Sequence, residues 1–212
     1  AERVAAAGQT VLAFSTSEAL VHPWGGRKAM LGTNPIAIGV PTNAAPSVMD
    51  TATSIVSIGQ VHDYANRGEP LHPGWALDAE GNPTTDAVAA KSGSLAPFGG
   101  AKGYALGLAF GLLTSSLAGA ALGRDVRGTL DSDAICNKGD LFIVIDGPSA
   151  ALEDYLDLLR QTEPVEGVDK VLIPGERGRA CRAERLRDGV PLADGLWRDL
   201  QQLAGEAGHK GA

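Results

Sequence analysis

Residues 94–123, SLAPFGGAKGYALGLAFGLLTSSLAGAALG, decide how the rest of the sequence is interpreted. A glycine-rich turn with one lysine, Lys102, opens the stretch, and no charged residue follows from Tyr104 to Gly123. Small residues recur at every fourth position, which places them on one helix face. These residues, the small-residue ridge, are Gly103, Gly107, Gly111, Ser115, Gly119 and Gly123. Each interior glycine costs about 1 kcal/mol of helix propensity relative to alanine, so we expect close packing along the ridge.

Large side chains occupy another face of the same stretch: Leu106, Phe110, Leu113 and Leu117. The pattern therefore predicts a buried helix entered through a glycine turn. A membrane span is the competing interpretation, because the uncharged run is nearly long enough to cross a bilayer and glycines four apart also occur at helix contacts in membranes. The many glycines and hydroxyls, and the charged remainder of the sequence, favour the buried helix and no membrane.

The glycine turn suits an anion, because backbone N–H groups converge at a helix N-terminus and the Lys102 ammonium adds positive charge. The simpler interpretation is a structural turn that only starts the helix.

The bulk composition narrows the classes of partner. With 212 residues, 44% of them hydrophobic, the chain can bury a sizeable core. A formal net charge of −7 argues against nucleic acid as a partner. Cys136 and Cys181 lie far apart without the spacing of a metal site, so we expect no metal and a cytoplasmic location.

Short apolar runs bounded by turn residues predict the strands. Ile36–Val40 and Ser47–Met49, separated by a proline-bounded turn, are expected to form an antiparallel hairpin. The remaining predicted strands are Thr10–Phe14, Leu141–Ile145, which we expect to be buried, and Val171–Ile173. Helices are predicted at Glu2–Ala7, Ile55–Arg67, Leu152–Gln161 and Leu192–Ala207.

Polar residues follow two of these strands. Asp50-Thr51-Ala52-Thr53-Ser54 comes after the hairpin, and it either caps the next helix through Asp50 or Ser54 or forms a ligand surface at a strand end. The turn Pro174–Arg179, directly after Val171–Ile173, contains two arginines. Arginine forks suit a phosphate, and a solvated basic turn is the alternative.

The order of six motifs resembles the malate/L-lactate dehydrogenase family that is unrelated to the Rossmann-type enzymes. The motifs are LGTNPIAIGVPT, MDTATS, GEPLHPGWALDAEGNPTTD, LAPFGGAKGYALGLAFGLL, CNKGDLFIVID and LIPGER, and they span nearly the whole chain. The resemblance implies an α/β fold with a mixed, largely antiparallel sheet packed with helices, like that of sulfolactate dehydrogenase. It also implies a homodimeric oxidoreductase that moves a hydride between NAD or NADP and a small 2-hydroxy, 2-oxo or cyclic imino acid.

The resemblance further implies the cofactor contacts. Matched family positions are Ser17, Asp50, Thr51, Ala52, Thr53, Lys102, Gly103, Gly175, Glu176 and Arg177. The family's acid/base histidine belongs to a motif upstream of Ala1, so no catalytic residue is assigned, and His22, His62, His72 and His209 do not occupy its position.

The resemblance and the start of the chain within an alanine-rich helix lead to two hypotheses. In the first, residues 1–145 are a cofactor-binding domain truncated on its N-terminal side, and residues 146–212 pack back on it. In the second, the chain works without catalysis as a nucleotide-binding or dimerisation module.

Overall fold

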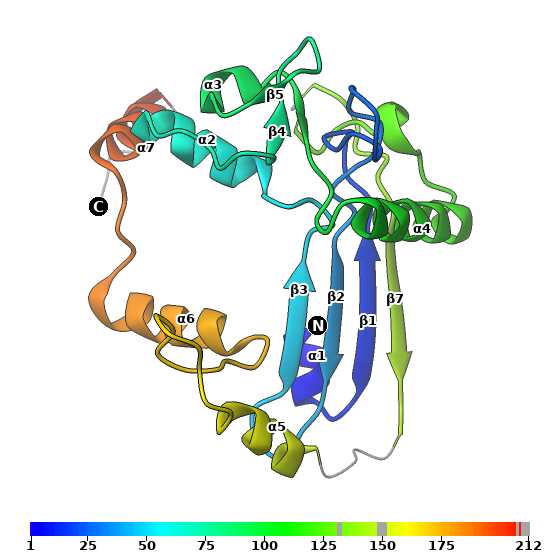
Figure 1. Cartoon of the computed structure of the whole chain (residues 1–212), viewed down its shortest axis with the longest axis vertical. Coiled ribbons are helices and arrows are strands. Elements are labelled where there is room, and N and C mark those ends of the chain that lie inside the picture. Colours follow the sequence, from blue (N-terminus) through cyan, green and yellow to red (C-terminus); the bar gives the residue numbers. More distant parts are fainter. Residues whose placement is uncertain (131–132, 148–151, 207, 209–212) are drawn as a thin grey trace. The chain divides into compact units, whose positions relative to one another are not determined.

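The computed structural model describes residues 1–130, 133–147, 152–206 and 208 (Figure 1). It divides into two compact units, Ala1–Pro174 and Gly175–Ala212, each described by itself. None of the helices in these described ranges is long and apolar enough to cross a membrane.

The main sheet of the first unit is antiparallel and has the strand order β3-β2-β1-β7. Leu12 in β1 lies opposite Ile38 on one side and Ile143 on the other. Helix α1 packs near β2 because Gly39 has no side chain: a Cβ there would lie 3.1 Å from that of Ala5. The elements are α1 (Glu2–Ala6), β1 (Thr10–Ser15), β2 (Ile36–Val40), β3 (Ser47–Thr51) and β7 (Asp140–Ile145), which confirms the predicted hairpin.

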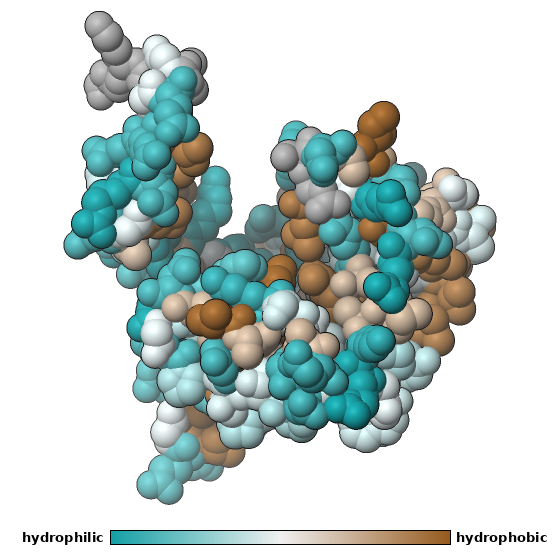
Figure 2. All heavy atoms as spheres, turned by 90° about the horizontal axis from the view of Figure 1, so that it is seen from above, coloured by the Kyte–Doolittle hydropathy of each residue, from teal (hydrophilic) through white to brown (hydrophobic). Residues whose placement is uncertain are grey.

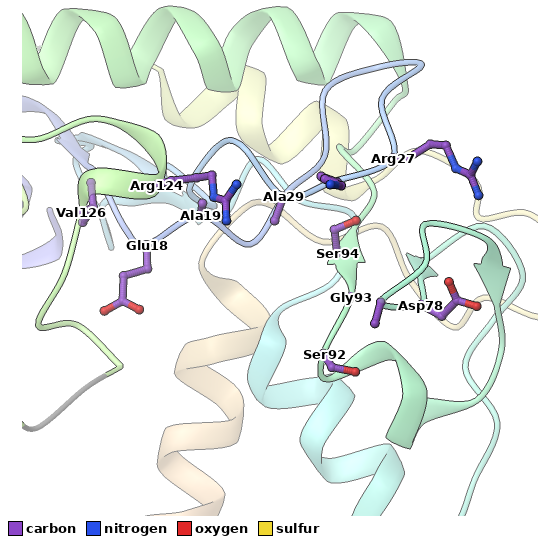
Figure 3. A pocket seen from close by; sticks show the side chains of 12 residues that line it. Glu18, Ala19, Arg27, Ala29, Asp78, Ser92, Gly93, Ser94, Arg124 and Val126 are labelled. Carbon is purple, nitrogen blue, oxygen red and sulfur yellow. The ribbon is translucent and has the colours of Figure 1, made fainter.

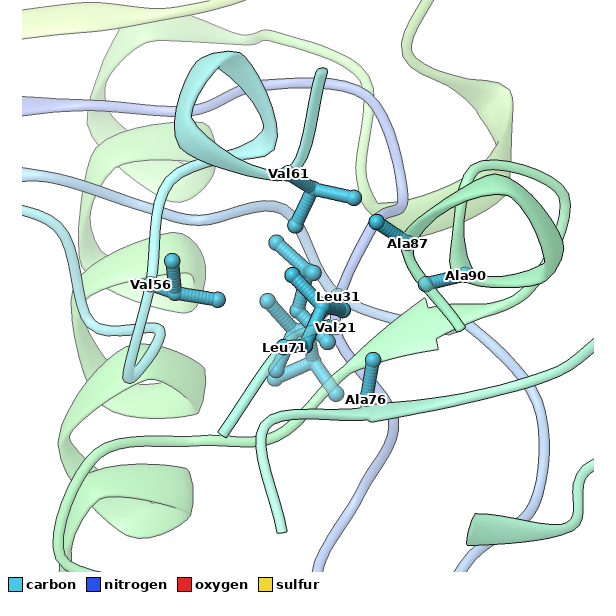
Figure 4. Close-up of a cluster of buried hydrophobic side chains, with 9 residues drawn as sticks. Val21, Leu31, Val56, Val61, Leu71, Ala76, Ala87 and Ala90 are labelled. Atoms are coloured by element: carbon cyan, nitrogen blue, oxygen red, sulfur yellow. The ribbon is translucent and has the colours of Figure 1, made fainter. Parts of the chain in front are cut away.

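A second, smaller sheet has the order β5-β4-β6 and packs with two helices. The main apolar cluster lies here, with Val61 and Leu95 almost fully buried (Figure 4). Its elements are α2 (Ile58–Arg67), β4 (Ala76–Leu77), β5 (Pro83–Thr84), α3 (Ala87–Ala90) and β6 (Ser94–Leu95). The N-cap of α2 is Ser57, whose Oγ accepts from Gln60 N at 3.1 Å, so the predicted caps Asp50 and Ser54 are wrong.

Helix α4 (Ala101–Ala118) contacts β1 and β7 (Figure 1). Its ridge is buried from Gly103 to Ser115, as predicted, but the helix ends at Gly119, which adopts φ 62°. The prediction that the large side chains are buried is wrong for Leu106, Leu113 and Leu117, which are 43%, 39% and 65% exposed. The ridge packs inward, and of the large side chains Phe110 reaches the sheet, with its ring centroid 5.2 Å from that of Phe14.

Two further predictions are corrected by the structure. Strand β7 forms as expected, but it is an edge strand, and Phe142 is 66% exposed. No strand forms at residues 171–173, which run as irregular chain, and the carbonyl of the following Pro174 accepts a hydrogen bond from Val48 N of β3 at 3.3 Å. The remaining elements are the short 3-10 helix η1 (Gly123–Asp125), α5 (Glu153–Arg160) and, in the second unit, α6 (Glu176–Asp188) and α7 (Asp194–Glu206).

Candidate functional site

A buried asparagine joins the sheet to the small-residue ridge of α4. Asn34 Nδ2 donates a 2.8 Å hydrogen bond to the carbonyl of Gly107. A Cβ at Gly111 would lie only 2.7 Å from that nitrogen. Asn34 has φ 31°, a conformation that asparagine tolerates better than most residues. Small residues are therefore required on this face of α4, because the Asn34 side chain packs directly against the helix backbone.

Thr33, the neighbour of Asn34, connects two of the predicted cofactor stretches. Its carbonyl accepts hydrogen bonds from Thr53 N and Thr53 Oγ1, both at 2.8 Å. Its backbone N–H donates to Ser17 Oγ at 2.9 Å. Since Thr53 is 2% exposed, these bonds fix the end of the hairpin beside the loop after β1.

The glycine turn lies next to the same strand end. Phe98 N donates to the Thr53 carbonyl at 3.1 Å, and a Cβ at Gly107 would lie 2.7 Å from Thr53 Oγ1. A Cβ at Gly103 would overlap the carbonyl oxygen of Phe98, so glycine is required where the turn enters α4. Thr33 and Thr53 thus hold Ser17 and the glycine turn in one place.

The turn presents backbone donors and a cation. Gly99 and Gly100 have φ 57° and 64°, and nothing lies within 4 Å of a Cβ built on Gly99. No side chain caps α4, and its first backbone hydrogen bond runs from Tyr104 N to Gly100 O. The N–H groups of residues 101–103 therefore have no acceptor among the described residues. Lys102 is exposed and forms no ion pair with any described residue.

The predicted cofactor residues thus fall into two groups. The first group belongs to the first unit. Its members in the hydrogen-bonded cluster around Thr33, or at the edge of that cluster, are Ser17, Thr53 and Gly103. Its remaining members are Ala52, which is partly buried, and the exposed residues Asp50, Thr51 and Lys102. Gly175, Glu176 and Arg177 belong to the second unit. There Gly175 has φ 96° and is the N-cap of α6, so the predicted basic turn is a helix start.

Lys138 and Asp140 fix the end of β1 that leads to Ser17. Lys138 Nζ donates to Asp140 Oδ1 at 2.7 Å and to Ser15 Oγ at 3.1 Å. The hydrogen bond from Lys138, with a further one from Ser15, lowers the pKa of the Asp140 carboxyl below its ordinary value.

The described histidines lie elsewhere. His62 and His72 are exposed, and the His72 ring packs at a tilt against Trp75, with the ring centroids 4.6 Å apart. His22 Nδ1 lies 3.0 Å from the carbonyl of Pro23, and His209 lies outside the described residues. Across the described residues, no His, Cys, Asp and Glu side chains gather as a metal site would require.

Sequence reasoning missed three residues of this region. The motif LGTNPIAIGVPT contains Thr33 and Asn34 without indicating a role for either, although a glycine ridge itself signals that another group approaches the helix. Trp24 is the third such residue: it is 61% exposed, and its ring lies 3.0 Å from a Cβ built on Gly100. The sequence signal for Trp24 was its position directly before Gly25 and Gly26, because an aromatic side chain next to a glycine turn can take part in binding.

The comparisons with known proteins agree with one another. A family model described as malate/L-lactate dehydrogenase matches residues 1–201. The L-sulfolactate dehydrogenase of Methanothermobacter thermautotrophicus is 40% identical, over 91% of this chain and 57% of its own length. The Δ1-pyrroline-2-carboxylate/Δ1-piperideine-2-carboxylate reductase of Pseudomonas aeruginosa is 37% identical, over 95% of this chain and 62% of its own.

Solved structures are similar over the same extent. A dehydrogenase from Sinorhizobium meliloti superposes with a TM-score of 0.90 at 49% identity, covering 96% of this chain and 61% of that one. Sulfolactate dehydrogenase from Methanocaldococcus jannaschii gives a TM-score of 0.84 at 33% identity, covering 98% and 62%. The expected fold class is therefore confirmed, and the chain spans about three fifths of the length of the proteins that it matches.

Proposed function

This chain belongs to the malate/L-lactate dehydrogenase family, and we propose that it forms the cofactor-binding part of an NAD(P)-dependent oxidoreductase. The reaction moves a hydride between nicotinamide and a small 2-hydroxy, 2-oxo or cyclic imino acid. The observation that carries the proposal is the Thr33 cluster, which joins the polar end of the hairpin to the glycine turn of α4. Relatives named for sulfolactate, lactate, malate and piperideine-2-carboxylate support this substrate class, and one relative is named for NADP(+).

The residues present fit a dinucleotide. Unbonded N–H groups at residues 101–103, with the Lys102 ammonium and open space at Gly99, suit a pyrophosphate. The exposed Asp50 carboxylate suits a ribose hydroxyl, and Thr51 adds a hydroxyl beside it. Taken by itself, the second unit presents the Arg177 guanidinium in the first turn of α6, a group that suits a phosphate. When bound, the nicotinamide supplies the hydride chemistry.

Ser17 and Thr53 have a positioning role in this proposal. Ser17 Oγ and Thr53 Oγ1 are both used in bonds to Thr33, so they orient the loop after β1 and the hairpin end rather than react. We propose that residues 1–145 carry most of the cofactor site, as a cofactor-binding domain. The exposed free thiols of Cys136 and Cys181 suit a reducing cytoplasm.

The reaction also needs an acid/base group at the substrate oxygen. None of the described histidines bonds to Ser17, Thr33 or Thr53. We therefore propose that this group is the family's histidine, supplied by the part of the relatives that the present chain does not match. Turnover then depends on that part, whereas dinucleotide binding relies on residues of this chain.

We propose a homodimer formed through the apolar faces of α4 and β7. The exposed side chains include Leu112 and Leu117 of α4 and Ile143 and Ile145 of β7. Strand alternation places these isoleucines on the sheet face that carries Phe14, against which Phe110 of α4 packs. Figure 2 shows hydrophobic side chains reaching the molecular surface. Apolar patches of this kind mark association sites, and edge strand β7 also has unpaired backbone groups that a second copy can cover.

Sedimentation of the purified chain tests the homodimer. We expect a dimer that Leu112→Glu converts to monomer, whereas Val88→Glu, at an exposed apolar residue of α3, leaves it unchanged. A wild-type monomer at all accessible concentrations contradicts the proposal.

Cofactor binding and turnover test the function. The chain is titrated with NADH and NADPH while energy transfer from tryptophan to nicotinamide is recorded, since Trp24 lies at the glycine turn. NADH oxidation is then measured with 2-oxo acids and, as a control, with simple ketones, for the chain alone and for the chain joined to the part of a relative that it does not match. Saturable binding by the chain, with oxidation by 2-oxo acids once that part is joined, supports the proposal. Binding without oxidation even in the joined protein favours the alternative, a non-catalytic nucleotide-binding module, and no binding of either nucleotide overturns both.

A further inference from the structure

A polar cleft of about 440 Å³ lies on the first unit (Figure 3). Its walls come from the loop after β1, the arm around Arg27 and Lys28, strand β6 and the 3-10 helix η1. None of the predicted cofactor residues lines it. The cleft is thus a feature that the proposed dinucleotide site does not use.

The acidic side chains of the cleft are already engaged within the chain. Glu18 Oε1 accepts hydrogen bonds from Thr129 N and Leu130 N, both at 2.8 Å, and from Thr129 Oγ1 at 2.9 Å. Asp78 Oδ1 accepts from Asn82 N at 2.8 Å, and this bond lowers the pKa of the Asp78 carboxyl. Both carboxylates therefore have structural roles at the rim of the cleft.

The basic side chains of the cleft are only partly engaged within the chain. Arg27 donates to the carbonyls of Glu80 and Gly81, both at 3.1 Å, which holds the arm in place. Lys28 and Arg124 also line the cleft, yet neither forms a hydrogen bond or ion pair with any described residue. The cleft thus has three cations against two internally bonded carboxylates, and two of its cations have no partner.

A buried hydroxyl adds an independent observation. Ser94 on β6 lines the same cleft and is 3% exposed, and its Oγ has no hydrogen-bond partner in the part of the chain that the structure describes. Buried polar atoms in native proteins nearly always have a partner, so an exception at a cleft wall points to a group that the chain itself does not supply.

We propose that this cleft binds a small organic oxyanion, a carboxylate or phosphate metabolite, distinct from the dinucleotide. Arg124 offers a planar fork for two oxygens, Lys28 a mobile point charge, and Ser94 a hydroxyl that side-chain rotation can present. The cleft volume falls in the range of small-molecule sites, which is larger than a bare anion needs. The ligand therefore has a carbon skeleton besides its charged group.

Thermal melting of the full chain with added anions tests the site. Inorganic phosphate, glycerol phosphate and malonate are titrated at constant ionic strength maintained with chloride. We expect at least one to raise the melting temperature in a saturable way, and the more effective class identifies phosphate or carboxylate. Arg124→Gln and Lys28→Gln should each weaken the apparent affinity about tenfold, whereas Lys170→Gln, an exposed lysine outside the cleft, should not.

Two results overturn the proposal. One is the absence of stabilisation by any of the anions beyond that of chloride. The other is equal stabilisation of Arg124→Gln and wild type, which means non-specific binding. Ser94→Ala gives a third measurement, since its hydroxyl has no partner: it should melt like wild type without anion and bind the anion more weakly. Lys102→Ala should leave the anion effect unchanged, which separates this site from the dinucleotide site.

Discussion

Adding one methyl group to the ridge of α4 should destabilise the protein, although the same change favours helices. In Gly111→Ala the new Cβ lies 2.7 Å from Asn34 Nδ2, closer than real Cβ contacts. Asn34 is buried and donates to the Gly107 carbonyl at 2.8 Å, so it cannot move away without breaking that bond. The substitution therefore forces either overpacking or the loss of a buried hydrogen bond.

The size of the effect follows from three contributions. Alanine gains about 1 kcal/mol of helix propensity over glycine. Overpacking costs roughly 1–3 kcal/mol, and a buried amide without its partner costs about 1–3 kcal/mol. Since one of the two costs applies and the propensity gain offsets part of it, we expect Gly111→Ala to lower the free energy of unfolding by about 0–2 kcal/mol; a loss of about 1 kcal/mol lowers the melting temperature by roughly 2–4 °C for a domain of this size.

Gly59→Ala is the matched control, because Gly59 lies in α2 of the same unit and a Cβ there approaches only Ser57 Oγ, at 3.9 Å. This variant should be stabilised by about 0.4–1 kcal/mol. In an Asn34→Gly background the cost of Gly111→Ala should largely disappear, since the obstructing amide is gone. Urea denaturation measures all four variants. If Gly111→Ala is as stable as Gly59→Ala, the reasoning about the ridge is refuted.

Three further predictions concern the cofactor turn, the β1 end and a helix cap. Lys102→Ala should weaken NADH or NADPH binding about tenfold in the energy-transfer titration, with Lys91→Ala as an unaffected control. Lys138 lowers the pKa of the Asp140 carboxyl below its ordinary value of 3.8, so Asp140→Asn should be less stable than wild type at pH 7. The difference in stability should vanish as the pH falls through the lowered pKa. A difference that does not depend on pH contradicts this. Ser57→Ala should lower the free energy of unfolding by about 1 kcal/mol, measured by urea denaturation, and an unchanged midpoint refutes its capping role.

Local sequence patterns predicted most of the secondary structure. β1, β2 and β3 follow from apolar runs between turn residues, and the hairpin follows from the short proline-bounded turn. The same apolar runs gave wrong predictions of burial. Leu141–Ile145 and the leucines of α4 are as apolar as core elements, but their burial depends on what covers them, and that is not a property of the local sequence.

The residues 171–173 show a second limit. Their composition favours a strand, but local composition does not decide whether regular pairing with a neighbouring strand forms. These residues run as irregular chain, although Val48 N of β3 donates to the carbonyl of the following Pro174. The cap of α2 was misplaced for a similar reason, because several hydroxyls precede the helix and only the chain path selects Ser57.

The parts of the candidate site that contain charged residues or glycines could be predicted from the sequence. Lys102 and the polar hairpin end stand out by chemistry, and the structure brings them together around Thr33. Thr33 itself could not be recognised, since it acts through its backbone carbonyl and N–H, which every residue has. Asn34 was equally hidden, because its partner is a helix carbonyl distant in the sequence.

Amide hydrogen exchange of the chain with and without NADH or NADPH tests the central claim most directly. If the hairpin end and the glycine turn hold one dinucleotide, saturating nucleotide should slow exchange in residues 50–53 and 98–107 together, with the same dependence on nucleotide concentration. Residues 58–67 of α2, outside the proposed site, should exchange as before. Saturable binding that protects neither stretch, or only one of them, would contradict the account.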